Sequence, residues 1–350
     1  MPNPFFFAGK ITNPDQFVGR GKELKKIFSY LDATHTGQIQ HVSVVGQRRI
    51  GKSSLLYHIS QIYSTRLSDH KNYRFVFLDL DKPHCHTQFG LLHHILQELG
   101  LPAPAEPTLE RFYDLIQQEH EKKKIWPVFL MDEFEHLPER AAEFPDQFYE
   151  SLRSLGNNNI VGLVTASHGK LQDLASQGKL TSPFFNIFHQ IDLKEFTDAE
   201  TKTLLERGVQ SDHPFTEYEC SQIIKLAGNH PACLQLAASA VYENKEDNKP
   251  INWGDIKQEV QSQPPYTTAV SASSTVLNWA WKIIKWPFVS LPQMAGRAFF
   301  DILKYEKSAP ETNWIVGVIL LATAIGLLAG FIPWTLVAKL IRRFTDLFIK

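Results

Sequence analysis

A short motif bounded by glycines constrains this chain more than any other part of its sequence. Residues 46–53 read GQRRIGKS and fit the pattern G-x-x-x-x-G-K-[ST] at every defined position. An apolar run, residues 41–45, precedes the motif, and residues 55–62 place leucines and isoleucines on one face of a helix. In such a strand–loop–helix unit, backbone N–H groups and the helix N-terminus surround phosphate oxygens. The sequence therefore predicts a loop that binds the phosphates of a nucleotide.

The motif assigns a role to its side chains. We expect Lys52 to reach the β- and γ-phosphates and to act in catalysis, and the hydroxyl of Ser53 to ligate Mg²⁺. The backbone of the loop should contact the phosphates along its length. The nucleotide-binding residues predicted here are Gly46, Gln47, Arg48, Arg49, Ile50, Gly51, Lys52, Ser53 and Ser54.

A second motif supplies carboxylates. The run VFLMDE, residues 128–133, places Asp132 and Glu133 directly after four apolar residues. We expect Asp132 to hold Mg²⁺ together with Ser53, and Glu133 to polarise the attacking water. The run VTAS, residues 164–167, contains Thr165 and Ser167, and we expect one of them, with Ser167 as the predicted site residue, to sense the γ-phosphate. The predicted cofactors are ATP or ADP and Mg²⁺.

Five strand-like runs predict an α/β fold. They are largely continuous apolar stretches with amphipathic segments between them, which is typical of parallel strands covered on both faces. Their ranges are 41–45, 73–81, 127–133, 160–167 and 188–193. After the last run the pattern becomes helical: Thr197 and Glu200 form a capping-box signature, and two helical stretches meet at GNHP, residues 228–231.

Composition limits the class of protein. The formal net charge of −1 argues against attraction of the whole molecule to nucleic acid, and we expect no nucleic-acid partner. The three cysteines form no C-x-x-C pair, which suits a reducing compartment rather than a disulfide framework.

The C-terminal part predicts a membrane module. Residues 314–338 carry no charge, and at about 1.5 Å per residue such a helix exceeds the roughly 30 Å hydrocarbon core. We expect a transmembrane helix there, hence a lipid bilayer as partner and the nucleotide domain on the cytoplasmic side. A single span would place the basic tail, residues 339–350, outside, whereas the positive-inside rule would keep it in the cytoplasm. Two alternatives remain open: residues 276–296 also enter the membrane and form a hairpin, or the module inserts stably only on activation.

These features divide the chain into five parts. They are a nucleotide-binding core (1–195), a helical lid (196–262), a linker with an amphipathic membrane-proximal segment (263–313), the transmembrane helix (314–338) and the basic tail (339–350).

Four motifs occur in order between residues 14 and 245: FVGRGKEL, VVGQRRIGKSSLL, VFLMDEFEHL and LAGNHPACLQLAA. Together they resemble the STAND-type and archaeal-ATPase-like branch of AAA-related P-loop ATPases. The resemblance implies a three-layer sandwich with a five-stranded parallel sheet of order 5-1-4-3-2, followed by a helical lid. It also implies that Gly19 and Arg20 lie beside the base, that Pro231 lies against the nucleotide and that His230 is a sensor. Asn229 stands where relatives commonly have a glycine.

The resemblance implies a switch that exchanges ADP for ATP on a stimulus and then oligomerises. Our hypothesis is a membrane-anchored ATPase that forms a homo-oligomer, responds to an unidentified protein or ligand, and acts as a prokaryotic conflict effector. One alternative is a nucleotide-dependent membrane scaffold with little turnover. Another is a DNA-handling ATPase related to origin-recognition proteins, although no basic winged-helix face is evident after residue 251.

Overall fold

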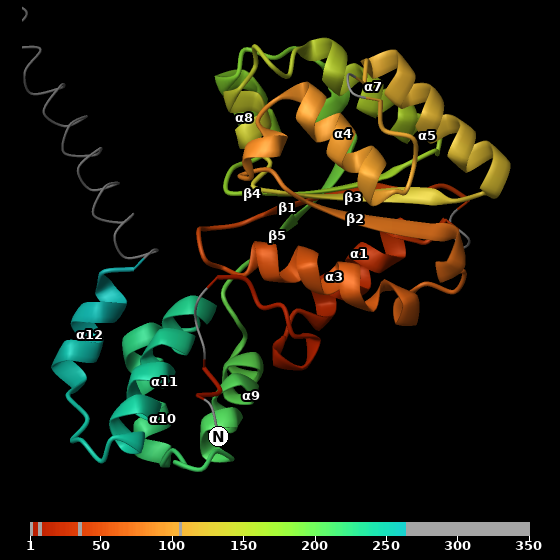
Figure 1. The fold of residues 1–350 in the computed structure, drawn as a ribbon. Helices are drawn as coiled ribbons and strands as arrows, with labels where there is room; N and C mark the ends of the chain where they lie inside the picture. The colour runs from red at the N-terminus through yellow and green to blue at the C-terminus, as the bar shows by residue number, and fades with distance from the viewer. Residues whose placement is uncertain (1–2, 6–8, 34–36, 105–106, 264–350) are drawn as a thin grey trace, which may run out of the picture. The chain divides into compact units, whose positions relative to one another are not determined.

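The computed structural model describes residues 3–5, 9–33, 37–104 and 107–263, all within one compact unit, Met1–Thr267. A parallel sheet with helices on both faces is followed by a group of helices (Figure 1). The predicted linker, transmembrane helix and basic tail lie outside the described residues, apart from residue 263. Within the described ranges, no helix combines the length and the apolar character needed to cross a bilayer.

The sheet has five parallel strands in the order β2-β3-β4-β1-β5, which is 5-1-4-3-2 when read from the β5 edge. The predicted α/β architecture is therefore confirmed. Two of the strands end at residues of the predicted site, because β3 ends at Asp132 and β4 at Ser167. The bounds are β1 His41–Val45, β2 Tyr73–Asp79, β3 Trp126–Asp132, β4 Gly162–Ser167 and β5 Phe188–Asp192.

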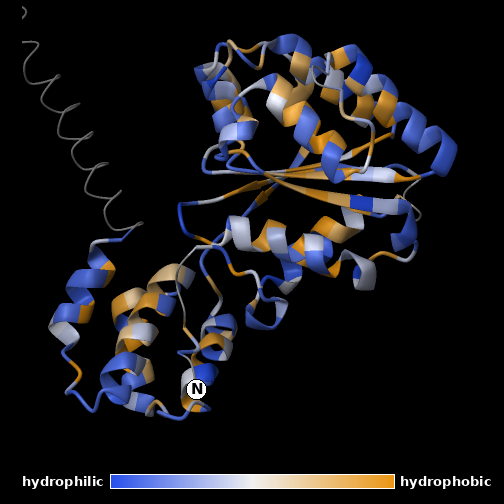
Figure 2. Ribbon diagram, viewed as in Figure 1, coloured by the Kyte–Doolittle hydropathy of each residue, from blue (hydrophilic) through white to orange (hydrophobic). Residues whose placement is uncertain are grey.

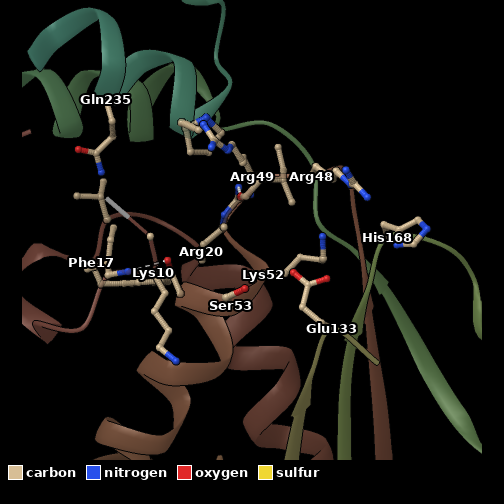
Figure 3. Close-up of a pocket in the computed structure, with 18 of the residues that line it drawn as sticks. Lys10, Phe17, Arg20, Arg48, Arg49, Lys52, Ser53, Glu133, His168 and Gln235 are labelled. Atoms are coloured by element: carbon tan, nitrogen blue, oxygen red, sulfur yellow. Dashed lines mark hydrogen bonds between the residues drawn. The ribbon is translucent and has the colours of Figure 1, made fainter. Parts of the chain in front are cut away.

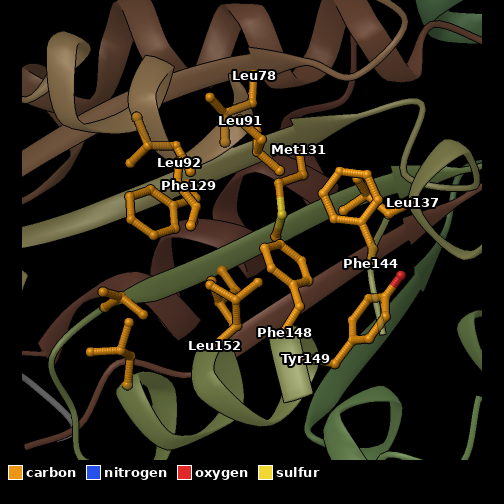
Figure 4. Packing of buried hydrophobic residues seen from close by; sticks show 14 of the residues in the cluster. Leu78, Leu91, Leu92, Phe129, Met131, Leu137, Phe144, Phe148, Tyr149 and Leu152 are labelled. Carbon is orange, nitrogen blue, oxygen red and sulfur yellow. The ribbon is translucent and has the colours of Figure 1, made fainter. Parts of the chain in front are cut away.

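Helices cover both faces of the sheet, which explains the continuous apolar strands. Phe129 and Met131 of β3 belong to a core with α4, α5, α7 and α8, whereas Val128 and Leu130 belong to a second core with α1 and α3. Figure 4 shows the first core, and Figure 2 shows the apolar residues gathered on the sheet. The helices are α1 Gly21–Leu31, α3 Lys52–Arg66, α4 Gln88–Glu98, α5 Leu109–Lys123, α6 His136–Glu139, α7 Asp146–Asn157 and α8 Leu171–Gln177.

Short 3-10 helices connect some of these elements. They are η1 Pro14–Gln16, η2 His70–Asn72, η3 Pro83–Cys85 and η4 Pro183–Asn186. Strand β2 ends two residues before the predicted limit, because the chain turns there and the Lys82 N–H donates to the Asp79 carbonyl over 3.1 Å.

The lid has its own hydrophobic core. Its helices are α9 Asp198–Val209, α10 Glu217–Ala227, α11 Pro231–Glu246 and α12 Trp253–Gln261. The capping box at Thr197 and Glu200 is present, as predicted. Helix α12 forms in a polar stretch because Ile256 and Val260, four residues apart, are both buried in this core. The N-terminal residue Phe5 also packs there, with its ring stacked 5.4 Å from the ring of Phe215.

Buried His41 should make the fold acid-sensitive. Burial, with a smaller contribution from His189, lowers the pKa of His41 from 6.5 to about 4. Between pH 6.5 and 4, His41 is protonated in the unfolded chain but stays neutral in the folded chain. The free energy of unfolding should therefore fall by up to roughly 3 kcal/mol over this range. Denaturant unfolding at pH 7, 6 and 5 measures this slope. The variant His41→Gln cannot titrate and should show a shallower slope; equal slopes would contradict the assignment.

Candidate functional site

A cavity of about 620 Å³ lies at the carboxyl edge of the sheet and is bounded by the phosphate loop, the strand ends, the N-terminal segment and the lid (Figure 3). Among the predicted site residues, those that line it are Arg20, Arg48, Arg49, Ile50, Gly51, Lys52, Ser53, Ser54, Glu133 and Pro231. The structure does not place the remaining six in the cavity wall: Gly19, Gly46, Gln47, Asp132, Ser167 and His230.

The phosphate loop has the geometry of an anion site. Helix α3 begins at Lys52 after Gly51, whose φ is 102°, and no side chain caps its N-terminus. The first N–H groups of a helix left uncapped in this way favour an anion. A side chain at Gly46 is excluded, because a Cβ atom there would lie 2.8 Å from the carbonyl oxygen of Leu193. The sequence motif thus reflects a loop packed tightly between β1 and the residue that follows β5.

Lys52 is held at the centre of this loop. Its Nζ donates to the carbonyl of Gly46 over 3.0 Å and to that of Gln47 over 3.1 Å. Burial lowers the pKa of Lys52, and the carboxylates of Glu133, Glu135 and Asp132 oppose that shift. A buried ammonium beside several carboxylates is suited to neutralising phosphate charge.

Asp132 and Ser53 form the candidate metal site. Asp132 is 4% exposed at the end of β3, where burial raises the pKa of its carboxyl group and the neighbouring Ser53 hydroxyl opposes that shift. The Oδ1 atom of Asp132 is buried and has no hydrogen-bond partner in the described structure. A buried carboxylate oxygen without a partner, next to a hydroxyl, fits a hard cation such as Mg²⁺. The described residues hold no group of three or more ligating side chains, so phosphates and water would complete the shell.

Glu133 lies beside Lys52 with an unusual backbone conformation. Its φ is 52°, in the left-handed region that non-glycine residues rarely adopt. Burial raises the pKa of Glu133, and the neighbouring Glu135 and Asp132 raise it further. Such strain is characteristic of functional sites. Figure 3 shows the Glu133 carboxylate close to the Lys52 side chain.

A histidine next to β4 was missed by the sequence analysis. His168 lines the cavity with its side chain 43% exposed, and its Nδ1 hydrogen-bonds Oε1 of the buried Glu135. Burial alone would raise the pKa of Glu135, but the bonds from His168 and from its own backbone N–H lower it. Ser167, the predicted γ-phosphate sensor, is fully buried and donates to the Gly169 carbonyl over 2.7 Å. The cavity-facing group at this strand end is therefore His168.

Gly19 and Arg20 connect the phosphate loop to the lid. The guanidinium of Arg20 donates to the carbonyl of Ile50 over 2.9 Å and to that of Lys194 over 2.6 Å. Its backbone N–H donates to Oε1 of Glu200 over 2.6 Å, and a Cβ at Gly19 would meet the same carboxylate. Arg20 thus lines the cavity while its charged end binds backbone carbonyls.

The lid contributes the turn before α11. Pro231 lines the cavity, whereas His230 is 1% exposed and lies against the backbone of Arg48 and the charge of Arg20. Burial lowers the pKa of His230 to about 4, so the ring is neutral at physiological pH. Asn229, the departure from the usual glycine, accepts at its side-chain oxygen from the Thr201 hydroxyl over 2.8 Å. It therefore fixes the turn to α9.

The N-terminal segment forms another wall that the sequence did not reveal. The Ile11 N–H donates to the Ser54 hydroxyl over 3.0 Å, and the ring of Phe17 stacks 4.0 Å from that of His58. Lys10 places its ammonium 4.2 Å from the ring centre of Phe77. No local motif marks these contacts, because they join this segment to α3 and β2.

The parallel sheet, the phosphate loop and the carboxylates after β3 define a P-loop nucleotide-binding domain. The family described as Novel STAND NTPase 2 matches residues 38–261, and the chain belongs to this family. The resemblance to STAND-type ATPases is thereby confirmed. No curated protein matches the chain significantly.

Solved structures share the fold at low sequence identity. The ORC2 protein of Aeropyrum pernix, in ADPNP–ADP complexes, is 13% identical with a TM-score of 0.58 over 75% of this chain and 71% of that one. A Walker-type ATPase of Pyrococcus abyssi is 14% identical with a TM-score of 0.55 over 89% and 91%. The ORC1 protein of Aeropyrum pernix, in complex with DNA, is 12% identical with a TM-score of 0.52 over 88% and 78%.

Proposed function

We propose that this protein is an ATP-hydrolysing switch in which the position of the lid depends on the nucleotide that is bound. The observation that carries the proposal is the composition of the cavity wall: Lys52 and Glu133 of the sheet domain and Pro231 of the lid line the same cavity. A nucleotide bound there would contact both parts. Its differential affinity for two lid positions would then shift their populations.

The residues present suggest a division of labour in hydrolysis. Lys52 and the start of α3 would bind and orient the phosphates, and Ser53 and Asp132 would hold Mg²⁺, which supplies charge neutralisation when bound. Glu133 would accept a proton from the attacking water. His168, oriented by Glu135, would donate a hydrogen bond from Nε2 to the terminal phosphate when its ring carries both protons.

We propose that the switch acts on the membrane segment. Residues 314–338 are proposed to anchor the protein, with the nucleotide domain in the cytoplasm and ATP-dependent homo-oligomerisation gathering the membrane segments. The stimulus would be a partner protein or ligand, and the role we propose for such a protein is that of a prokaryotic conflict effector. Purification in detergent, with measurement of ATP turnover and of oligomer mass with and without ATP, tests the proposal. Constant mass and no turnover would refute it.

A DNA-handling role is the rival suggested by the likeness to origin-recognition proteins, one of them solved with DNA. Lys and Arg number 36 against 37 Asp and Glu, which does not favour that role. Binding of duplex DNA at low salt, weakening steeply as salt rises, would support it over the switch.

Removing His168, the proposed hydrogen-bond donor to the terminal phosphate, should weaken the preference for ATP over ADP. We expect His168→Ala to raise the Kd for ATP about tenfold relative to that for ADP, the loss of roughly one charge-assisted hydrogen bond. Glu135→Gln should give a smaller change in the same direction. Titration with fluorescent ATP and ADP analogues measures both constants. His136→Ala is the control, since His136 also lines the cavity but pairs with Glu139 over 2.9 Å. Equal changes for ATP and ADP would contradict the assignment.

A further inference from the structure

Arg49, in the middle of the phosphate loop, reaches the far end of the lid. Its φ is 60°, and its side chain both lines the cavity and donates a hydrogen bond from Nη1 to Oε1 of Gln263. Gln263 lies 214 residues further along the chain, just after α12. The phosphate loop therefore contacts the chain directly after α12.

The position of Gln263 is set by the lid core. Ile256 and Val260 of α12 are 4% and 0% exposed, and α12 packs on α10 and α11. The Gln263 N–H donates to the carbonyl of Val260 over 3.1 Å, so the chain is still continuous with the last turn of the helix. Beyond this residue the sequence continues into the C-terminal part that carries the predicted membrane segment.

A phosphate in the cavity that Arg49 lines would offer its guanidinium a different kind of acceptor from Gln263. The Gln263 amide oxygen is neutral, whereas phosphate oxygens are charged and match the planar, forked geometry of arginine. Charge-assisted hydrogen bonds of this kind are about twice as strong as those between neutral groups. A nucleotide in the cavity would therefore compete with Gln263 for Arg49.

We propose that Arg49 is shared between Gln263 and the phosphates of the bound nucleotide, so that nucleotide binding releases the end of α12. The inference rests on the proposed nucleotide switch and names its route from the phosphate loop to the C-terminal part. Coupling of this kind is reciprocal: whatever strengthens the Arg49–Gln263 contact weakens nucleotide binding by the same factor.

Two substitutions at Gln263 should act in opposite directions. Gln263→Ala removes the competing acceptor and should lower the Kd for ATP about threefold, whereas Gln263→Glu turns the contact into an ion pair and should raise it about threefold. The full chain is used in detergent with a fluorescent ATP analogue. Gln261→Ala, an exposed change on the same helix, is the control and should leave the Kd unchanged.

A second measurement tests whether nucleotide binding releases the chain after α12. In the wild type, ATP should increase protease cleavage after residue 263, measured by mass spectrometry, whereas in Gln263→Ala cleavage should be high with or without ATP. If Gln263 had a merely structural role, both substitutions would shift the Kd for ATP in the same direction. The inference would be overturned by that result, or by unchanged Kd values together with wild-type cleavage that does not depend on nucleotide. Wild-type protein that binds ATP but shows these negative results would leave the proposed switch standing. Failure of the wild type to bind any nucleotide would remove the switch itself.

Discussion

Lys52→Ala is expected to abolish nucleotide binding, raising the Kd for both ATP and ADP by a factor of about 100 or more. Lys52, the first residue of α3, is 6% exposed, and its ammonium donates to the carbonyls of Gly46 and Gln47. In the nucleotide complex this ammonium would donate to the β- and γ-phosphates. Charge-assisted hydrogen bonds contribute about 1.5–3 kcal/mol each, so losing these two corresponds to a loss of roughly 10²–10⁴ in affinity. Calorimetric titration of the purified full chain with ATP and with ADP measures the effect.

Two controls separate loss of the phosphate contact from loss of the fold. Lys123→Ala removes a lysine whose side chain is 61% exposed on α5, away from the cavity wall, and should leave both constants unchanged. Thermal unfolding of the Lys52→Ala variant without nucleotide should resemble that of the wild type. The variant should also lose any ATP-dependent assembly, and unchanged oligomer mass on addition of ATP in both proteins would contradict the switch.

The sheet was predictable because its strands are buried on both faces. Alternate residues of β3 enter two different cores, so an unbroken apolar run such as residues 128–131 has one straightforward structural explanation. The phosphate loop was predictable for a related reason. Its function requires glycines at fixed positions, where a Cβ at Gly46 would strike a backbone carbonyl and where Gly51 has a left-handed conformation.

The remainder of the site depends on contacts between distant parts of the chain. Glu135 and His168 are 33 residues apart, and nothing in either local sequence indicates that they pair. The sequence points to Ser167 as sensor because it ends the apolar run of the fourth strand. It lies within β4, however, where its hydroxyl turns to Gly169, whereas His168 follows the strand and lines the cavity. The membrane segment, residues 314–338, stays a prediction from composition.

Glu133→Gln is expected to lower the rate of ATP hydrolysis by a factor of about 100 or more, within the range typical for loss of a general base. The amide has nearly the same size as the carboxylate but cannot accept the proton of the attacking water. Burial and the neighbouring Glu135 and Asp132 already raise the pKa of Glu133, so the neutral side chain should be well tolerated. Single-turnover measurements with excess enzyme report the chemical step separately from product release.

The Kd for ATP should change differently from the rate of hydrolysis, and this difference distinguishes the switch from the nucleotide-dependent scaffold. Removing a negative charge near the phosphates should leave the Kd for ATP unchanged or lower it by up to about tenfold. The variant should therefore accumulate in the ATP-bound form and show the larger oligomer mass at lower ATP concentration than the wild type. Glu139→Gln makes the same chemical change at another residue of the cavity wall, 58% exposed on α6, and should alter neither rate nor mass. A wild type without measurable turnover, unaltered by Glu133→Gln, would instead favour the nucleotide-dependent scaffold, because a scaffold needs the phosphate loop but not a base.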